Sequence, residues 1–185
     1  VHTKSINMQL KSANSELEKL YVHDHMTGLL NRRGFYRQFH QQLKESSGKN
    51  MSIVIISADL DGLKHINDTF GHTEGDNAIT TVGKALVSSA IQGEVCSRFG
   101  GDEFCVLLKD EESEARCAKT LQALLAERRK VFAILPTVSL GSAAFSGEDV
   151  VTVKDRADRA LYCAKKEQKA RAAAEKHADD SEQTA

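Results

Sequence analysis

VCSRFGGDEFCVLL, residues 95–108, is the stretch that decides how the middle of this chain folds. Two mostly apolar runs, Val95 to Phe99 and Glu103 to Leu108, lie on either side of Gly100-Gly101. Glycine adopts the positive φ angles that tight turns require, so the stretch predicts an antiparallel hairpin. Asp102 then lies at the tip of the predicted hairpin.

A second apolar run, MSIVIISA at residues 51–58, lies upstream and predicts a buried strand that leads into Asp59. A short loop, LDGL at residues 60–63, follows it. In α/β proteins, phosphates and metals bind where a strand ends and a helix begins. If this strand neighbours the hairpin, Asp59 and Asp102 converge, and paired carboxylates favour a divalent cation. Taken singly, Asp59 fits a helix N-cap and Asp102 fits an ordinary turn residue equally well.

Helices and one more strand complete the pattern. Asn31 is a plausible N-cap for a helix that carries Phe35, Phe39 and Leu43. Further helices are expected over about residues 63–69, 74–90 and 111–129 and from Thr152 into the 160s, with a strand over residues 137–144. This order predicts an α/β fold with a mixed central sheet flanked by helices.

The two ends of the chain are expected to differ from the middle. Residues 1–22 predict a helical extension with apolar residues at Ile6, Leu10, Ala13, Leu17 and Leu20. Their alternating steps of four and three match a coiled-coil seam, although only about two heptads are present. Dimerisation through the seam and packing of the helix on its own domain both stay open. Residues 171–185 are expected to be a polar tail that either extends the last helix or is frayed or disordered.

Composition limits the possible classes of function. The 25 basic and 26 acidic side chains leave a net charge of −1, which argues against nucleic acid and anionic membrane surfaces as partners. No apolar run approaches the roughly 18 residues of a membrane span. The four cysteines form no C-x-x-C pair, so we expect free thiols in the cytoplasm. Because the chain begins with Val1, we expect a longer protein with an upstream sensor domain.

Five segments resemble, in order, the motifs of the GGDEF family of diguanylate cyclases. They are DHMTGLLNRRGF (24–35), DLDGLKHINDTFGHTEGD (59–76), RFGGDEF (98–104), SLGSA (139–143) and ADRALYCAKK (157–166). The resemblance implies a GGDEF domain over residues 23–170 with the nucleotidyl-cyclase-like fold of that family. It also implies the activity, in which two facing domains condense two GTP into cyclic di-GMP and release pyrophosphate.

The resemblance further implies roles for individual residues. Asp59, Asp102 and the Leu60 carbonyl would hold two Mg²⁺ ions, with Mn²⁺ as an alternative, and Asp102, Asp59 and Glu103 would be the catalytic residues. The GTP-binding residues would be Gly62, Leu63, Lys64, Asn67, Asp76, Gly100, Gly101, Lys165 and Lys169. Of these, Asn67 and Asp76 would hydrogen-bond the guanine edge. Arg98 and Asp24 are expected to form a structural ion pair.

Two departures from the family pattern bear on regulation and rate. Many relatives carry an R-x-x-D inhibitory site where this chain has Ile91 and Glu94, so we expect no product inhibition by that route. The family often ends in AK-x-x-GRN, where Gln168 and Lys169 stand here, and lysine lacks the bidentate phosphate fork of arginine. A catalytically weak or inactive domain that binds GTP or a partner is therefore the alternative, and a purely structural dimeriser is a weaker one.

Overall fold

The computed structural model describes residues 6, 8, 21–45, 52–131, 134–135 and 137–182. The seam positions Leu10, Ala13, Leu17 and Leu20 lie outside the described residues, so the coiled coil stays a prediction. The described elements are α2 (Arg32–Glu45), β1 (Val54–Leu60), α3 (Leu63–Phe70), α4 (His72–Ser89), β2 (Val95–Gly100), β3 (Glu103–Leu108), α5 (Glu112–Val131), β4 (Val138–Ala144) and α6 (Val150–Glu182). Each helix and strand expected beyond residue 22 is thus present, with shifted ends.

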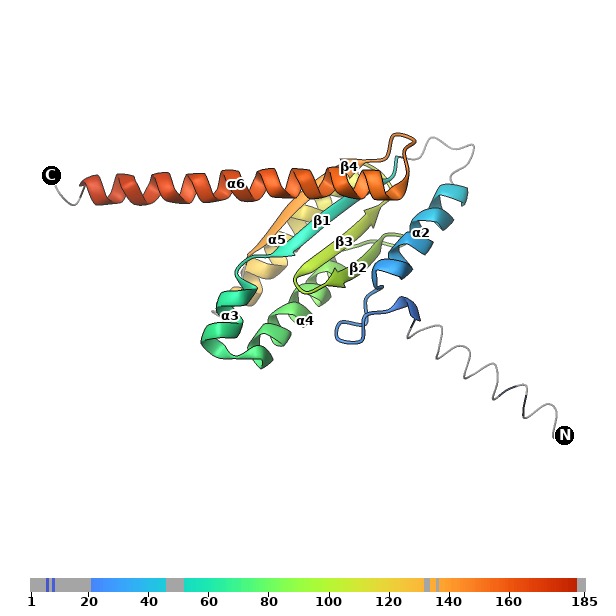
Figure 1. Cartoon of the computed structure of the whole chain (residues 1–185), viewed down its shortest axis with the longest axis horizontal. Coiled ribbons are helices and arrows are strands. Elements are labelled where there is room, and N and C mark those ends of the chain that lie inside the picture. Colours follow the sequence, from blue (N-terminus) through green and yellow to red (C-terminus); the bar gives the residue numbers. More distant parts are fainter. Residues whose placement is uncertain are drawn as a thin grey trace.

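The four strands form one sheet in the order β2-β3-β1-β4 (Figure 1). Neighbouring strands pair antiparallel, and β1 lies between β3 and β4. Parallel pairing is limited, within the described part of the chain, to an isolated bridge between Leu30 and Ser97. Helices α3 and α4 connect β1 to β2, and α5 connects β3 to β4, which is the βαββαβ arrangement. The predicted α/β fold with a central sheet flanked by helices is confirmed, but the sheet of β1 to β4 is antiparallel rather than mixed, because the strands that flank each helical connection are not neighbours in the sheet.

The alternation of side chains along β1 divides the core into two layers. Val54 and Ile56 pack in a cluster with residues of α4 and α5 on one face. Ile53 and Ile55 pack on the other face with residues of α2 and α6, including the fully buried Phe35. The sheet is therefore covered on both faces, and its strand ends remain the open edges where a site can form.

Helix α6 approaches the sheet very closely at Gly141 in β4. A Cβ atom added to Gly141 would lie 2.0 Å from the backbone nitrogen of Leu161 and 2.6 Å from the carbonyl oxygen of Ala157. Only glycine leaves room for this contact, which fixes the height of α6 above the sheet. Gly141 therefore sets the position of every α6 side chain that reaches toward the end of β1.

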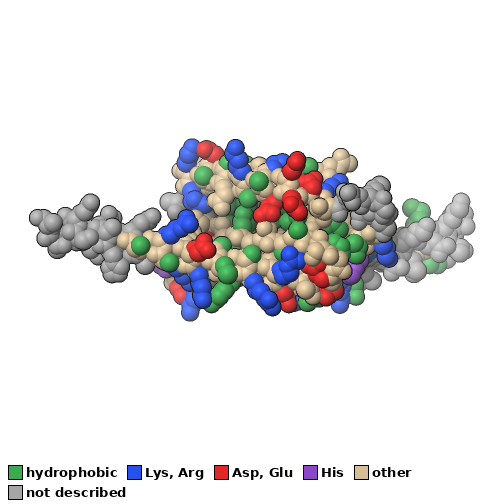
Figure 2. Space-filling model, turned by 90° about the horizontal axis from the view of Figure 1, so that it is seen from above, with side chains coloured by type: hydrophobic (Ala, Val, Ile, Leu, Met, Phe, Trp, Pro, Cys, Tyr) green, Lys and Arg blue, Asp and Glu red, His purple; other side chains and the backbone are tan. Residues whose placement is uncertain are grey.

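Beyond the sheet, α6 continues as a helix to Glu182 and projects away from the rest of the molecule (Figure 1). The tail was expected either to extend the last helix or to be frayed or disordered, and residues 171–182 extend the helix. Their sequence is rich in alanine, which has the highest helix propensity. No helix among the described residues is both long and apolar enough to cross a bilayer. In the face seen in Figure 2, acidic and basic side chains are interspersed, in keeping with the near-zero net charge.

Candidate functional site

A pocket of about 410 Å³ lies at the end of β1, beside the tip of the β2–β3 hairpin and next to α6. Its lining residues are Asp59, Leu60, Asp61, Gly62, Leu63, Lys64, Asp102, Thr137, Lys165, Gln168 and Lys169. They come from parts of the chain that are far apart in sequence. The pocket therefore unites the residues expected to hold a metal with three lysines expected to face phosphate.

Strand register brings the two expected metal carboxylates together. Strand β1 neighbours the hairpin, which is the condition for Asp59 and Asp102 to converge, and the Leu60 amide donates a hydrogen bond to the carbonyl of Asp102 at 3.1 Å. Asp59 lies directly opposite Glu103 in the same ladder. The alternative that Asp59 caps the following helix is wrong, because the N-cap of α3 is Gly62.

The environment of Asp59 disfavours its negative charge. Burial raises the pKa of the Asp59 carboxyl above its usual value, a hydrogen bond from Lys165 opposes that rise, and the negative charge of Asp102 adds to it. Only 20% of the Asp59 side chain is exposed. A carboxylate in such surroundings is stabilised by a nearby cation, and Lys165 supplies one through its hydrogen bond to Asp59 Oδ1.

Asp61 has no role expected from the sequence, yet it is held firmly at the rim of the pocket. Its Oδ2 accepts a hydrogen bond from Thr137 at 2.7 Å, and its Oδ1 accepts one from Ser139 at 2.8 Å. Its own amide donates to the Thr137 carbonyl at 2.9 Å. Lys165 Nζ lies 3.5 Å from Asp61 Oδ1, so the same ammonium serves both Asp59 and Asp61.

The pocket suits a magnesium ion that is shared with a bound substrate. No group of three or more His, Cys, Asp or Glu side chains positioned to hold a metal occurs among the described residues. Asp59, Asp102 and the Leu60 carbonyl nevertheless line one pocket. Mg²⁺ is usually held by one or two carboxylates together with substrate phosphates rather than by an all-protein cage. The oxygen donors present therefore fit Mg²⁺ completed by a polyphosphate.

The loop between β1 and α3 exposes backbone amides to the pocket. Gly62 adopts a left-handed conformation with φ 78°, and no side chain hydrogen-bonds to this end of α3. The N-terminal amides of α3 are then available to an anion, which the helix dipole also favours. Lys64, Lys165 and Lys169 line the same pocket. Amides and ammonium groups together make this side of the pocket complementary to phosphate.

The predicted ion pair between Arg98 and Asp24 is confirmed, and it also supports the hairpin tip. Arg98 Nη1 lies 3.2 Å from Asp24 Oδ1, while Nε and Nη2 donate to the Gly101 carbonyl at 3.1 and 2.9 Å. Burial acts to raise the pKa of Asp24, but hydrogen bonds from Thr27 and Arg98 outweigh it, so the pKa falls below its usual value. This network fixes the backbone that carries Asp102.

Several expected residues lie outside the lining of the pocket. Asn67 and Asp76 lie on the adjacent helices α3 and α4, and Asn67 Oδ1 lies 1.9 Å from the point where a Cβ on Gly75 would be. The remaining three are Gly100, Gly101 and Glu103, which lie at the exposed hairpin. The structure thus places the expected guanine contacts together on one helix pair, apart from the carboxylates.

Glu94, at the expected inhibitory position, is used inside the protein. Its side chain is fully buried, one oxygen accepts the Ile91 amide at 2.8 Å, and the other is paired with Arg116. Arg116 also donates to the Ser89 carbonyl at 2.7 Å. Glu94 is therefore committed to contacts within the protein, while Ile91 at the other expected position is exposed.

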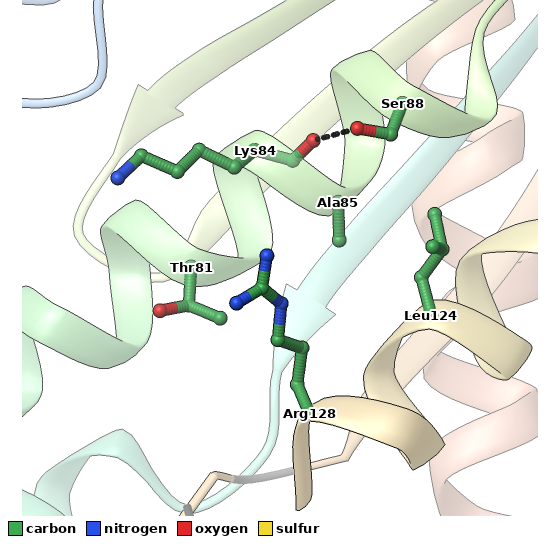
Figure 3. Close-up of a pocket in the computed structure, with 6 residues that line it drawn as sticks. All are labelled: Thr81, Lys84, Ala85, Ser88, Leu124 and Arg128. Carbon is green, nitrogen blue, oxygen red and sulfur yellow. Dashed lines mark hydrogen bonds between the residues drawn. The ribbon is translucent and has the colours of Figure 1, made fainter. Parts of the chain in front are cut away.

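A second pocket, between α4 and α5, has a different chemistry (Figure 3). Its volume is about 230 Å³, and it is lined by Thr81, Lys84, Ala85, Ser88, Leu124 and Arg128. Ser88 donates a hydrogen bond to the Lys84 carbonyl at 3.0 Å, as Figure 3 shows. This lining contains cations and hydroxyls but no carboxylate, whereas the pocket at Asp59 combines two carboxylates expected to bind metal with lysines and helix amides.

Comparison with known proteins gives one consistent family. The family model described as "Diguanylate cyclase, GGDEF domain" matches residues 21–171. Diguanylate cyclase DgcM of Escherichia coli is 36% identical over 162 residues, which cover 84% of this chain and 38% of DgcM. The crystal structure of the coiled coil and GGDEF domain of DgcB from Caulobacter crescentus, in complex with c-di-GMP, superposes with a TM-score of 0.77 at 26% identity and covers 89% of this chain and 91% of that one.

One further relative carries a different name. Cyclic di-GMP phosphodiesterase NbdA of Pseudomonas aeruginosa is 34% identical over 119 residues, covering 63% of this chain and 15% of NbdA. The chain spans about a third of the length of the first curated relatives that it matches, 30% of one and 38% of another.

Proposed function

Because this chain belongs to the GGDEF domain family, we propose that it is a diguanylate cyclase, which joins two GTP molecules into cyclic di-GMP and releases two pyrophosphates. The observation that carries the proposal is the single pocket in which Asp59 and Asp102 meet the amides of α3 and three lysines. Such a pocket is suited to phosphoryl transfer, in which catalysis is mostly positioning and charge stabilisation.

In this proposal each domain binds one GTP across two regions. The triphosphate lies against the amides of Gly62 and Leu63, with Lys64, Lys165 and Lys169 supplying positive charge. The guanine edge is bound by Asn67 and Asp76 on α3 and α4, and the acidic side chain favours GTP over ATP. Gly100 and Gly101 leave room for the nucleotide at the hairpin tip.

Asp59, Asp102 and the Leu60 carbonyl would hold two Mg²⁺ ions, or Mn²⁺, together with the triphosphate. GGDEF diguanylate cyclases depend on a metal, and when bound the ions neutralise phosphate charge and lower the pKa of the attacking 3′-hydroxyl. The oxygen of that hydroxyl attacks the α-phosphorus of the facing GTP as the bond to pyrophosphate breaks. Asp102 takes the proton in our proposal, and Glu103, opposite Asp59, contributes negative charge beside it.

GGDEF domains bind GTP and function as dimers, and the proposed reaction needs two copies because each pocket holds one GTP. The helix predicted from the sequence at residues 1–22 would set the geometry of that homodimer and connect it to an upstream sensor domain. We propose a cytoplasmic setting for this part of the protein, where GTP and Mg²⁺ are available. The curated relatives extend well beyond the matched segment, which leaves room for such a sensor.

The second candidate is a domain that binds GTP or a partner without catalysis. It is favoured by Gln168 and Lys169, which line the pocket where many relatives have glycine and arginine. The match to a protein named a phosphodiesterase also shows that this sequence pattern is not confined to proteins named cyclases. Retention of both Asp59 and Asp102 in the pocket favours the enzyme.

The test is incubation of the purified chain with GTP and Mg²⁺, followed by mass spectrometry for cyclic di-GMP, beside Asp102→Ala and Glu103→Gln. We expect product from the unmodified chain and at least a hundredfold less from Asp102→Ala, with folding verified by circular dichroism. Nucleotide binding by the unmodified chain without any product, even after forced dimerisation, would favour the second candidate.

A further inference from the structure

Lys165 lies between the carboxylates of Asp59 and Asp61, and we propose that it is a movable counterion that passes from Asp59 to Asp61 when a divalent cation binds. The inference rests on the proposed function, which places that cation at Asp59. It makes Asp61 a positioning residue for the metal site, although Asp61 need not touch the metal.

The starting position of Lys165 is defined by its two partners. Its ammonium is hydrogen-bonded to Asp59 Oδ1, and the same nitrogen is 3.5 Å from Asp61 Oδ1. The exposed fractions of the three side chains are 29% for Lys165, 20% for Asp59 and 25% for Asp61. Because these groups are largely shielded from solvent, their mutual attraction is stronger than that of a fully exposed pair.

A divalent cation and the ammonium compete for Asp59. An ion bound to the Asp59 carboxylate would repel the ammonium and take the lone pair that Lys165 now uses. The backbone at Lys165 is restrained, because Leu161, one turn earlier in α6, rests against Gly141 in the sheet. The flexible four-carbon stem of lysine nevertheless allows the ammonium to move while the helix stays in place.

Asp61 is prepared to receive the ammonium. The hydroxyls of Thr137 and Ser139 and the amide contact at Thr137 hold the Asp61 carboxylate in one orientation. Each carboxylate oxygen has two acceptor positions, so Oδ1 retains one beside its bond from Ser139. A movement of roughly 1 Å brings Lys165 from 3.5 Å to the distance of a charge-assisted hydrogen bond.

The consequence is that Lys165 weakens metal binding at Asp59 while Asp61 relieves that competition. Removal of Lys165 should therefore tighten metal binding, and removal of the Asp61 charge should weaken it by confining Lys165 to Asp59. In the absence of Lys165, the Asp61 charge should matter little. General disruption of the pocket predicts weaker binding for every variant, so the opposite signs are diagnostic.

The experiment is a calorimetric titration of the nucleotide-free chain with Mn²⁺ alone, extended to millimolar concentrations because water must complete the coordination in place of a polyphosphate. The proteins compared are the unmodified chain, Lys165→Met, Asp61→Asn and the double variant. We expect Kd for Lys165→Met to fall roughly three- to tenfold, Kd for Asp61→Asn to rise by a similar factor, and the double variant to match Lys165→Met. Thr137→Val is a milder change that loosens Asp61, and it should raise Kd less than Asp61→Asn does. Circular dichroism verifies folding.

Three results would overturn the inference. One is no measurable Mn²⁺ binding by any variant, and another is an unchanged Kd in Lys165→Met. The third is equal weakening by Asp61→Asn whether or not Lys165 is present, which would make Asp61 a direct attractor of the metal. Since no GTP is present, these outcomes are independent of whether the chain makes cyclic di-GMP.

Discussion

Gly141→Ala is the single substitution whose effect can be worked out most completely from the structure. The added Cβ would meet Leu161 N at 2.0 Å, Leu161 Cα at 2.5 Å and the Ala157 carbonyl oxygen at 2.6 Å. Ordinary contact begins at 3.4 Å, so α6 would have to retreat from the sheet by about 1.4 Å. All three atoms belong to the backbone, so no change of side chain on α6 relieves the clash.

The retreat has two measurable effects. Overpacking of this kind costs about 1–3 kcal/mol, and at about 2–4 °C per kcal/mol for a chain of this size the Tm should fall by roughly 2–12 °C. Lys165, one turn beyond Leu161, would be withdrawn from Asp59. A displacement of about 1 Å near reacting groups reduces rates by up to roughly a hundredfold. We therefore expect cyclase activity to fall by up to that factor even at temperatures where Gly141→Ala remains folded.

The matched control is Gly83→Ala, the same substitution in α4. There the added Cβ would lie 3.4 Å from Thr27 and 3.5 Å from Leu29, which are ordinary contacts. Replacement of a helical glycine by alanine gains about 0.5–1 kcal/mol, so this variant should melt at or above the temperature of the unmodified chain. Equal Tm and equal activity for Gly141→Ala and the unmodified chain would refute the contact between α6 and the sheet as described.

Three other predictions concern the charged residues Asp24, Glu94 and Asp76. Asp24→Asn should reduce the free energy of unfolding by about 1.5–3 kcal/mol at neutral pH, since it weakens the bond to Arg98. Because folding lowers the pKa of Asp24, the stabilisation by its carboxylate is fully present above pH 3.8 and is lost as pH falls through the lowered pKa. In denaturant titrations, the difference in free energy of unfolding between the unmodified chain and Asp24→Asn should therefore be smaller at pH 3 than at pH 7. Glu94→Ala leaves Arg116 without its buried partner and should lower the free energy of unfolding, measured in urea, by about 1–3 kcal/mol. In a separate assay, added cyclic di-GMP should inhibit the unmodified chain only weakly. Asp76→Ala should reduce the preference for GTP over ATP by roughly 10–100-fold in competition assays, and an unchanged preference would contradict a guanine contact at this position.

Local signals predicted the elements of the fold well. The Asn31 cap is present, with its side chain accepting the Gly34 amide at 3.0 Å, and the hairpin forms around Gly100 and Gly101. Strand β1 runs on to Leu60, two residues past its expected end, because its last residues pair with β3 and β4. Pairing partners of this kind are not visible in a local sequence pattern.

The candidate site was less accessible to sequence reasoning where it depends on long-range contacts. Asp61 gained no expected role because the hydroxyls that hold it belong to Thr137, just before β4, and to Ser139 in β4, which are 76 and 78 residues away. Its position two residues after Asp59 was the only available signal. For Glu94, the sequence predicted only that an R-x-x-D inhibitory site is missing. Its pairing with Arg116 could not be predicted, because it depends on how α5 packs. The expected roles of Asn67 and Asp76 rest on the family resemblance, and their placement on adjacent helices is compatible with it.

The central claim is that the pocket at Asp59 and Asp102 makes cyclic di-GMP from two GTP molecules. The most direct measurement uses the chain held as a dimer by an added coiled coil, with GTP and Mg²⁺, and quantifies cyclic di-GMP and pyrophosphate together. The account predicts two pyrophosphates for each cyclic di-GMP in the unmodified dimer and neither product from a dimer of Asp59→Asn. GTP binding by the unmodified dimer with no cyclic di-GMP formed would contradict it.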